Sequence, residues 1–165
     1  MHPVRPDSTR PCQESVWGYP RPAIAEPTAA HILIRLGGAI VANTRRAVRT
    51  LETSHPPSYY IPPEDIALGV LVPADGSSFC EWKGHARYFD VSSGGESRKR
   101  AAWSYPEPPV PFAILRSYFA FYAGAMDACF VDGERVVAQP GCFYGGWITS
   151  AVAGPFKGVP GSRFW

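Results

Sequence analysis

Short runs of apolar residues, broken by glycine and proline, recur through the body of the chain. The runs 31–36 and 39–44 flank Gly37-Gly38, which predicts two antiparallel strands joined by a tight hairpin turn. Apolar and polar positions then alternate over 47–52, as they do in a strand with two different faces. A third strand is therefore expected there, with Glu52 at its end.

The rest of the chain is also divided into short segments by residues that favour turns. Asp75-Gly76, Gly94-Gly95 and Asp132-Gly133 are typical of turns between strands. Pro62–Asp65 predicts a turn that opens a single helical turn, and apolar spacing over 110–118 predicts the one short helix. The remaining strands are expected, in chain order, at 59–61, 78–82, 87–92, 99–105, 120–122, 127–131 and 135–139.

Many short strands separated by turns predict a mainly β protein, with small antiparallel sheets in a curled, barrel-like arrangement and one short helix. The 18 prolines and 16 glycines agree with this, and 165 residues suit a single domain. Residues 1–28 are expected to form an extended arm that packs on the domain through Trp17 and Tyr19. Residues 29–140 would form the β-domain, and 141–165 an ordered tail rich in glycine and aromatic residues.

Composition limits the classes of function. A net charge of +2 is too small to indicate a nucleic-acid partner, and a short basic run such as Arg98-Lys99-Arg100 is typical of a solvated strand end. No run approaches the roughly 18 apolar residues of a membrane span. Residues 1–22 lack the apolar core of a signal peptide, so we expect a cytoplasmic protein with reduced cysteines. The tail is compatible with a homodimer.

Residues 79–88 combine a thiol, an amine, an imidazole and aromatic rings around a glycine that lets the backbone bend. We expect desolvation to lower the pKa of Lys83, which would make it a base or an anion anchor. Cys80 is a candidate ligand-binding thiol, and a nucleophilic role would need a cation from Lys83 or His85. The alternatives are an exposed lysine at a turn and a thiol that fills core space.

An aromatic wall is predicted from Tyr88, Trp103 and Tyr105, since the last two share one face of a strand. Such a wall suits a flat or apolar organic ligand, and ordinary core packing is the alternative. Strand alternation allows only one of Tyr59 and Tyr60 to face the same pocket. We assign Tyr60 as the candidate catalytic phenol.

Carboxylates and histidines complete the candidate set. Glu52, at the end of its strand, is a candidate general acid or base. Asp65 is a candidate ligand-binding group or the cap of the short helix. His85 can titrate near neutral pH and is assigned to ligand binding. A metal site would combine Cys80 with His55 or His85, but the spacing fits no standard zinc pattern and we expect no metal.

Four motifs occur in one order: Tyr59–Ile66, Cys80–Tyr88, Ala102–Pro106 and Ala120–Tyr122. Over about residues 30–140 the chain thereby resembles the family described as domain of unknown function 427. The resemblance implies a β-tent-like fold, in which small antiparallel sheets meet over a pocket. Related domains often hold zinc through cysteine pairs, which this sequence lacks.

The same family sometimes carries a nucleotidyltransferase label. The sequence has no glycine-rich phosphate loop ending in Lys-Ser or Lys-Thr, and no paired strand aspartates for Mg²⁺, so no cofactor is expected. Our leading hypothesis is a small-molecule-binding β-domain that performs acid–base chemistry on an organic metabolite, although the sequence does not decide whether it is an enzyme. The alternative is a non-catalytic module that binds a peptide or a single-stranded nucleic acid, through the basic run and exposed aromatic rings.

Overall fold

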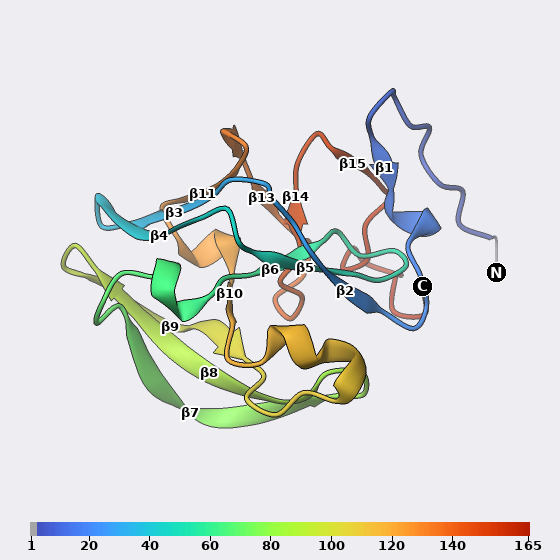
Figure 1. Cartoon of the computed structure of the whole chain (residues 1–165). Coiled ribbons are helices and arrows are strands. Elements are labelled where there is room, and N and C mark those ends of the chain that lie inside the picture. Colours follow the sequence, from blue (N-terminus) through green and yellow to red (C-terminus); the bar gives the residue numbers. More distant parts are fainter. Residues whose placement is uncertain (1–2) are drawn as a thin grey trace.

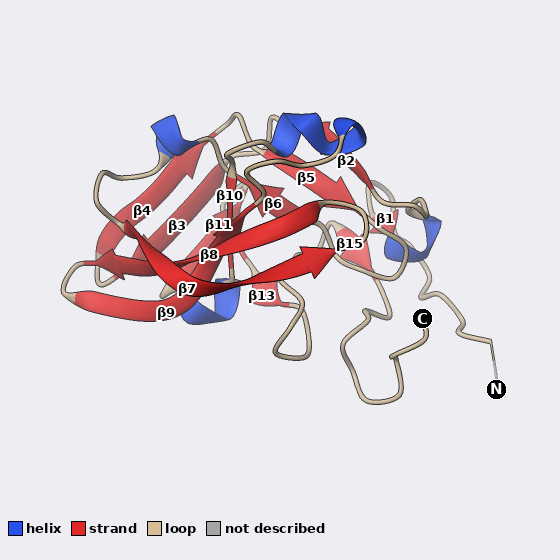
Figure 2. Ribbon diagram, turned by 90° about the horizontal axis from the view of Figure 1, so that it is seen from below, coloured by secondary structure: helices blue, strands red, loops and turns tan. Residues whose placement is uncertain are grey.

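Several small sheets, nearly all of them antiparallel, make this single-domain protein mainly β. The computed structural model describes residues 3–165, and Figures 1 and 2 show it from two directions. One four-stranded sheet has the order β10 (Phe119–Phe121), β9 (Glu96–Ser104), β8 (Gly84–Ser93), β7 (Leu71–Cys80). A second has the order β12 (Glu134–Arg135), β11 (Ala128–Val131), β3 (Ile32–Leu36), β4 (Ala39–Thr44).

Smaller sheets connect these two and reach the chain ends. The three-stranded one has the order β2 (Ile24–Pro27), β5 (Val48–Leu51), β6 (Ser58–Tyr60). The two-stranded ones pair β13 (Val137–Ala138) with β14 (Trp147–Ile148), and β1 (Glu14–Ser15) with β15 (Val152–Ala153). Each sheet keeps two separate edge strands, and none within residues 3–165 closes or curls strongly. The expected barrel-like curling is therefore wrong.

Three predicted turns are confirmed by the backbone. Gly37-Gly38, Gly94-Gly95 and Asp132-Gly133 join antiparallel strands, and both residues of each pair have a positive φ. A two-residue hairpin turn with this geometry matches the right-handed twist of the strands beside it. The glycine pairs therefore fix the register of β3 with β4 and of β8 with β9.

The predicted turn at Asp75-Gly76 is wrong, because β7 continues through it. The ladder shifts register between Pro73 and Ser77, and Gly76, with φ +92°, lies within this bulge. Pro73 cannot donate to a ladder, and β7 is an edge strand that tolerates such a residue. The positive φ that glycine permits in a turn is also permitted in a bulge such as this one.

The predicted helix over 110–118 is a shorter 3₁₀ segment, η3 (Val110–Leu115). Pro111 stands in its first turn, and Phe112, at φ −115° and ψ 18°, departs from helical geometry. The other helical segments of the described chain are also short 3₁₀ turns: η1 (Val16–Gly18), η2 (Pro63–Asp65) and η4 (Ala123–Ala125). Phe112 and Leu115 are the buried side chains that hold η3 on the domain.

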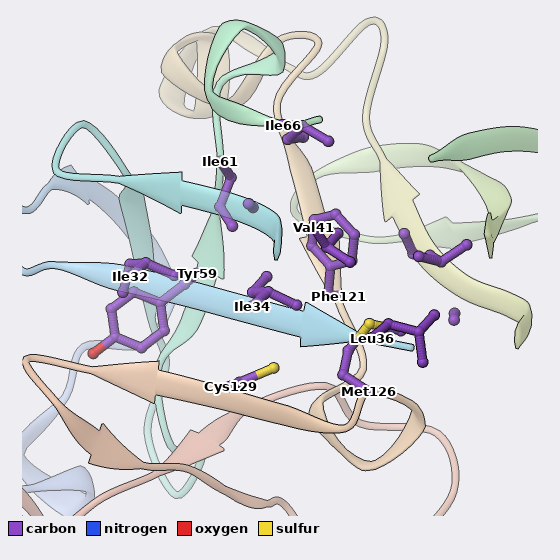
Figure 3. Packing of buried hydrophobic residues seen from close by; sticks show 14 of the residues in the cluster. Ile32, Ile34, Leu36, Val41, Tyr59, Ile61, Ile66, Phe121, Met126 and Cys129 are labelled. Carbon is purple, nitrogen blue, oxygen red and sulfur yellow. The ribbon is translucent and has the colours of Figure 1, made fainter. Parts of the chain in front are cut away.

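The largest core lies between the two four-stranded sheets and is shown in Figure 3. Ile32, Ile34 and Leu36 of β3 are fully buried and belong to the same cluster as Phe121 of β10. Burial of each such side chain contributes about 1.5–3 kcal/mol. A second core lies under η3 and includes Tyr60, Trp103 and Tyr105, so its aromatic residues also face the candidate site.

The two ends of the chain pack on each other. β1 pairs in parallel with β15, and Val16 is completely buried beside Val152. The indole Nε1 of Trp17 donates to the carbonyl of Pro155 at 2.8 Å, and its ring lies 5.5 Å from that of Trp165. The tail is thereby held against the domain, where its residues reach the cavity described next.

Candidate functional site

A cavity of about 280 Å³ lies where β5 and β6, the sheet of β7–β10 and the C-terminal tail meet. Seven of the nine residues singled out from the sequence line it: Glu52, Tyr60, Cys80, Lys83, Tyr88, Trp103 and Tyr105. Strand alternation accounts for several of these positions. Tyr60 faces the cavity whereas Tyr59 belongs to the other core, 5.3 Å from the ring of Trp147.

The structure does not bring Asp65 and His85 to the cavity. The carboxylate of Asp65 accepts hydrogen bonds from Arg46, at 2.8 and 3.1 Å, and from Thr44 Oγ1 at 2.7 Å. The hydrogen bonds from Arg46 and then from Thr44 lower the pKa of Asp65. The hydrogen bond from Thr44 also links η2 to β4. His85 is exposed on β8, with its ring 5.0 Å from that of Phe79.

Aromatic rings form one wall of the cavity. Trp103 lies 4.6 Å from Tyr122 between ring centroids, and its Nε1 donates to Tyr60 Oη at 3.3 Å. Burial raises the pKa values of Tyr60 and Tyr105, and it raises that of Tyr122 to about 12. These phenols are therefore protonated at neutral pH. Tyr88 Oη shares a hydrogen bond of 2.8 Å with Ser78 Oγ.

Lys83 stands in the turn between β7 and β8, where Gly84 adopts a φ of +89°. Its Nζ lies 5.9 Å from the centroid of the Tyr105 ring and has no hydrogen-bond or ion-pair partner within residues 3–165. Desolvation opposes its charge, but the phenol of Tyr60, the thiol of Cys80 and the carboxylate of Glu52 together raise the pKa of Lys83. The expected lowering is thus wrong, and Lys83 is an ammonium at neutral pH, suited to anchor an anion.

A hydrogen-bond chain that the sequence did not indicate orients His55, which lies beside Glu52. Gln139 Oε1 accepts from the backbone N–H of Gly146 at 3.0 Å, which fixes the orientation of the amide. Its Nε2 then donates to His55 Nδ1 at 3.0 Å and to the carbonyl of Lys157 at 2.9 Å. Because Nδ1 must accept, the ring proton of neutral His55 is on Nε2, 3.7 Å from Glu52 Oε2.

The neutral state of His55 has a second physical cause. Burial lowers the pKa of His55 to about 4, and the positive charge of Lys157 acts in the same direction, whereas Glu52 opposes it. Protonation at Nδ1 would also place a proton against the amide of Gln139. His55 is therefore a neutral hydrogen-bond donor over the whole physiological range of pH.

The tail completes the cavity with Phe143, Tyr144, Gly145 and Lys157. A Cβ at Gly145 would overlap the ring of Trp103, so only glycine lets the tail approach this closely. The sequence offered one signal for this contact, a Gly-Gly pair between aromatic residues, but it did not say where the pair packs.

The remaining candidate features are the cysteines, a possible metal site and the basic run. The cysteines are free, and Cys129 is buried in the largest core, where burial raises its pKa to about 12. Within residues 3–165 no three His, Cys, Asp or Glu side chains gather as a metal site would require. Arg98 pairs with Glu96 at 3.0 Å and Lys99 with Asp90 at 3.1 Å, so much of the basic run is neutralised.

The profile of the family described as "Domain of unknown function (DUF427)" matches residues 24–132, well over half of the chain. The chain therefore belongs to this family. A comparison with curated proteins found no match. No helix in the described part of the chain is long and apolar enough to cross a membrane. Part of the cavity wall, from Gln139 onward, lies outside the matched range.

Proposed function

We propose that the protein binds a small organic molecule in this cavity and performs acid–base chemistry on it. The observation that carries the proposal is the Lys83 ammonium, which lies beside tyrosine and tryptophan rings without an internal partner. A half-buried charge of this kind is costly unless a ligand or water pairs with it. Known ligand sites likewise combine apolar walls with a few convergent polar groups.

The chemical roles follow from the state of each group. Glu52 supplies a carboxylate that can accept a proton, and Nε2 of His55 lies 3.7 Å from its Oε2. Tyr60 is a protonated phenol that can donate a hydrogen bond or a proton. Lys83, being cationic, would anchor negative charge rather than act as the base. The sheet of β7–β10, which meets the strands β5 and β6 at this cavity, also supports a β-tent-like arrangement.

The alternative of a module for single-stranded nucleic acid is less well supported. It depends on the run Arg98-Lys99-Arg100, of which two side chains already form ion pairs. The guanidinium of Arg100 stacks on the Tyr88 ring at 4.3 Å. Such engaged charges have less to offer to phosphates, whose neutralisation drives non-specific binding.

Native mass spectrometry of the gently purified protein tests the binding proposal. The expected result is an additional organic mass, absent after denaturation, on the wild type and on Lys99→Met, the surface control. Lys83→Met should lose this mass. If no variant carries extra mass, even after incubation with a small-molecule extract of the producing cells, the binding proposal is refuted.

Catalysis needs a separate test once that mass has identified the substrate. Glu52→Gln, which keeps the size of the side chain, should bind this substrate but turn it over at least about a hundredfold more slowly. Parental rates in folded Glu52→Gln and Tyr60→Phe would remove the acid–base roles and leave a binding protein.

A further inference from the structure

We propose that the ligand of this cavity is a small, planar organic acid whose carboxylate is bound by Lys83 and whose ring lies against the aromatic wall. This inference rests on the proposed function and narrows it to a class of ligand. Three observations support it: two free donors, a single cation without a hydrogen-bond partner, and the size and lining of the cavity.

Two free donors line the cavity, together with the carboxylates of Glu52 and Glu81, which accept no hydrogen bond within the described residues. Lys83 Nζ and Tyr105 Oη have no hydrogen-bond partner within the described residues, and both residues line the cavity. Two other phenols are engaged: Tyr88 with Ser78, and Tyr122 with the carbonyl of Phe143 at 3.2 Å. A ligand with acceptor oxygens would satisfy both Lys83 Nζ and Tyr105 Oη, and a charged oxygen pairs best with an ammonium.

The count of free cations favours a carboxylate over a phosphate. Lys157 already donates from Nζ to the Trp165 carbonyl at 3.2 Å, while His55 is neutral. That leaves Lys83 as the free cation among the described lining residues. Sites for phosphate gather several donors, such as arginine forks or helix N-termini, and none of these lines the cavity.

The size and lining of the cavity favour a small, planar ligand. About 280 Å³ is slightly below the roughly 300–1,000 Å³ of sites for drug-sized ligands. Trp103 and Tyr105 present aromatic surface, and Tyr60 packs edge-on against Trp103 with ring centroids 6.3 Å apart. Aromatic side chains favour offset or edge-to-face contact with another ring.

Fluorine-19 NMR with three probes of similar size tests the inference: 4-fluorobenzoate, 4-fluorobenzamide and 4-fluorobenzylamine. The benzoate should bind at least about tenfold more tightly than the amide, the usual gain of a charge-assisted hydrogen bond. Lys83→Met should weaken benzoate binding by a similar factor and leave amide binding unchanged. Tyr105→Phe, which keeps the ring, should weaken it several-fold, and Lys99→Met should have no effect.

Contrary outcomes separate this inference from the proposed function. Equal or tighter binding of the amide or the amine, unaffected by Lys83→Met, would overturn the organic-acid class while the cavity remains a binding site. Failure of all three probes to bind also overturns it. In that case an organic mass on the purified protein would still support the proposed function, and its absence would refute both.

Discussion

Replacement of Gln139 by glutamate should change how the stability of the protein depends on pH. In the wild type, burial holds the pKa of His55 at about 4 against an ordinary value of 6.5. Between these values the unfolded chain binds more protons than the folded one, so the free energy of unfolding rises with pH. The contribution is complete above pH 6.5 and is lost as the pH falls toward 4. A difference of about 2.5 pKa units corresponds to about 3 kcal/mol.

Gln139→Glu keeps the shape of the side chain but presents an acceptor to Nδ1 of His55 instead of an N–H donor. The carboxylate should favour a proton on Nδ1 and raise the pKa of His55 to 6.5 or above. It should also destabilise the fold by about 1–3 kcal/mol at pH 7.5, because the carbonyl of Lys157 loses its donor. Acidification from pH 6.5 to 4.5 should then narrow the gap in stability between the two proteins by about 2 kcal/mol.

The assay is urea unfolding across this pH range, together with long-range ¹H–¹⁵N NMR of the imidazole. His85→Gln, which removes an exposed imidazole, is the control and should follow the wild-type curve. Parallel stability curves for the wild type and Gln139→Glu would refute the reasoning. So would a wild-type His55 that carries its neutral proton on Nδ1.

Three other predictions concern packing, reactivity and charge. Gly145→Ala should destabilise the protein by about 1–3 kcal/mol in thermal or urea unfolding, because the added methyl overlaps Trp103; an unchanged midpoint would contradict the close approach. Exposed Cys142 should react with a thiol reagent at once, whereas Cys129 should react only on unfolding; rapid reaction of Cys129 in the native protein would contradict its burial. Lys83→Met should leave the free energy of unfolding equal to or above that of the wild type, since the ammonium has no internal partner; a loss above about 2 kcal/mol would show a partner that the structure lacks.

Much of the strand pattern could be predicted from the sequence because it depends on local rules. Alternation and turn pairs located β3, β4 and the hairpins, since a pair of glycines admits positive φ wherever it occurs. The same rules misplaced Asp75-Gly76, because local chemistry does not distinguish a turn from a bulge in a long edge strand. They also extended η3 too far, since apolar spacing does not anticipate the positive φ of Ser117, which a helix cannot include.

The residues of the candidate site were also predicted only in part. Lys83, Trp103 and Tyr105 were found because they belong to compact motifs on adjacent strands. Gln139 was missed because it lies 84 positions from the His55 ring that it contacts. A contact of this kind depends on how the tail folds back over the domain, and local sequence patterns carry no information on that path. The pKa of Lys83 was mistaken for a related reason, because the groups that raise it include Tyr60 and Glu52 from other strands.

The most direct test of the account is ¹³C NMR of the lysine Cε atoms, because the chain has only Lys83, Lys99 and Lys157. The account predicts that the Lys83 signal keeps the shift of an ammonium up to at least its ordinary pKa of 10.5. It further predicts that this signal moves when 4-fluorobenzoate is added, while that of Lys99 does not. A Lys83 signal that titrates well below 10.5, or that ignores the benzoate, would contradict the central claim that this lysine is the anion anchor of the cavity.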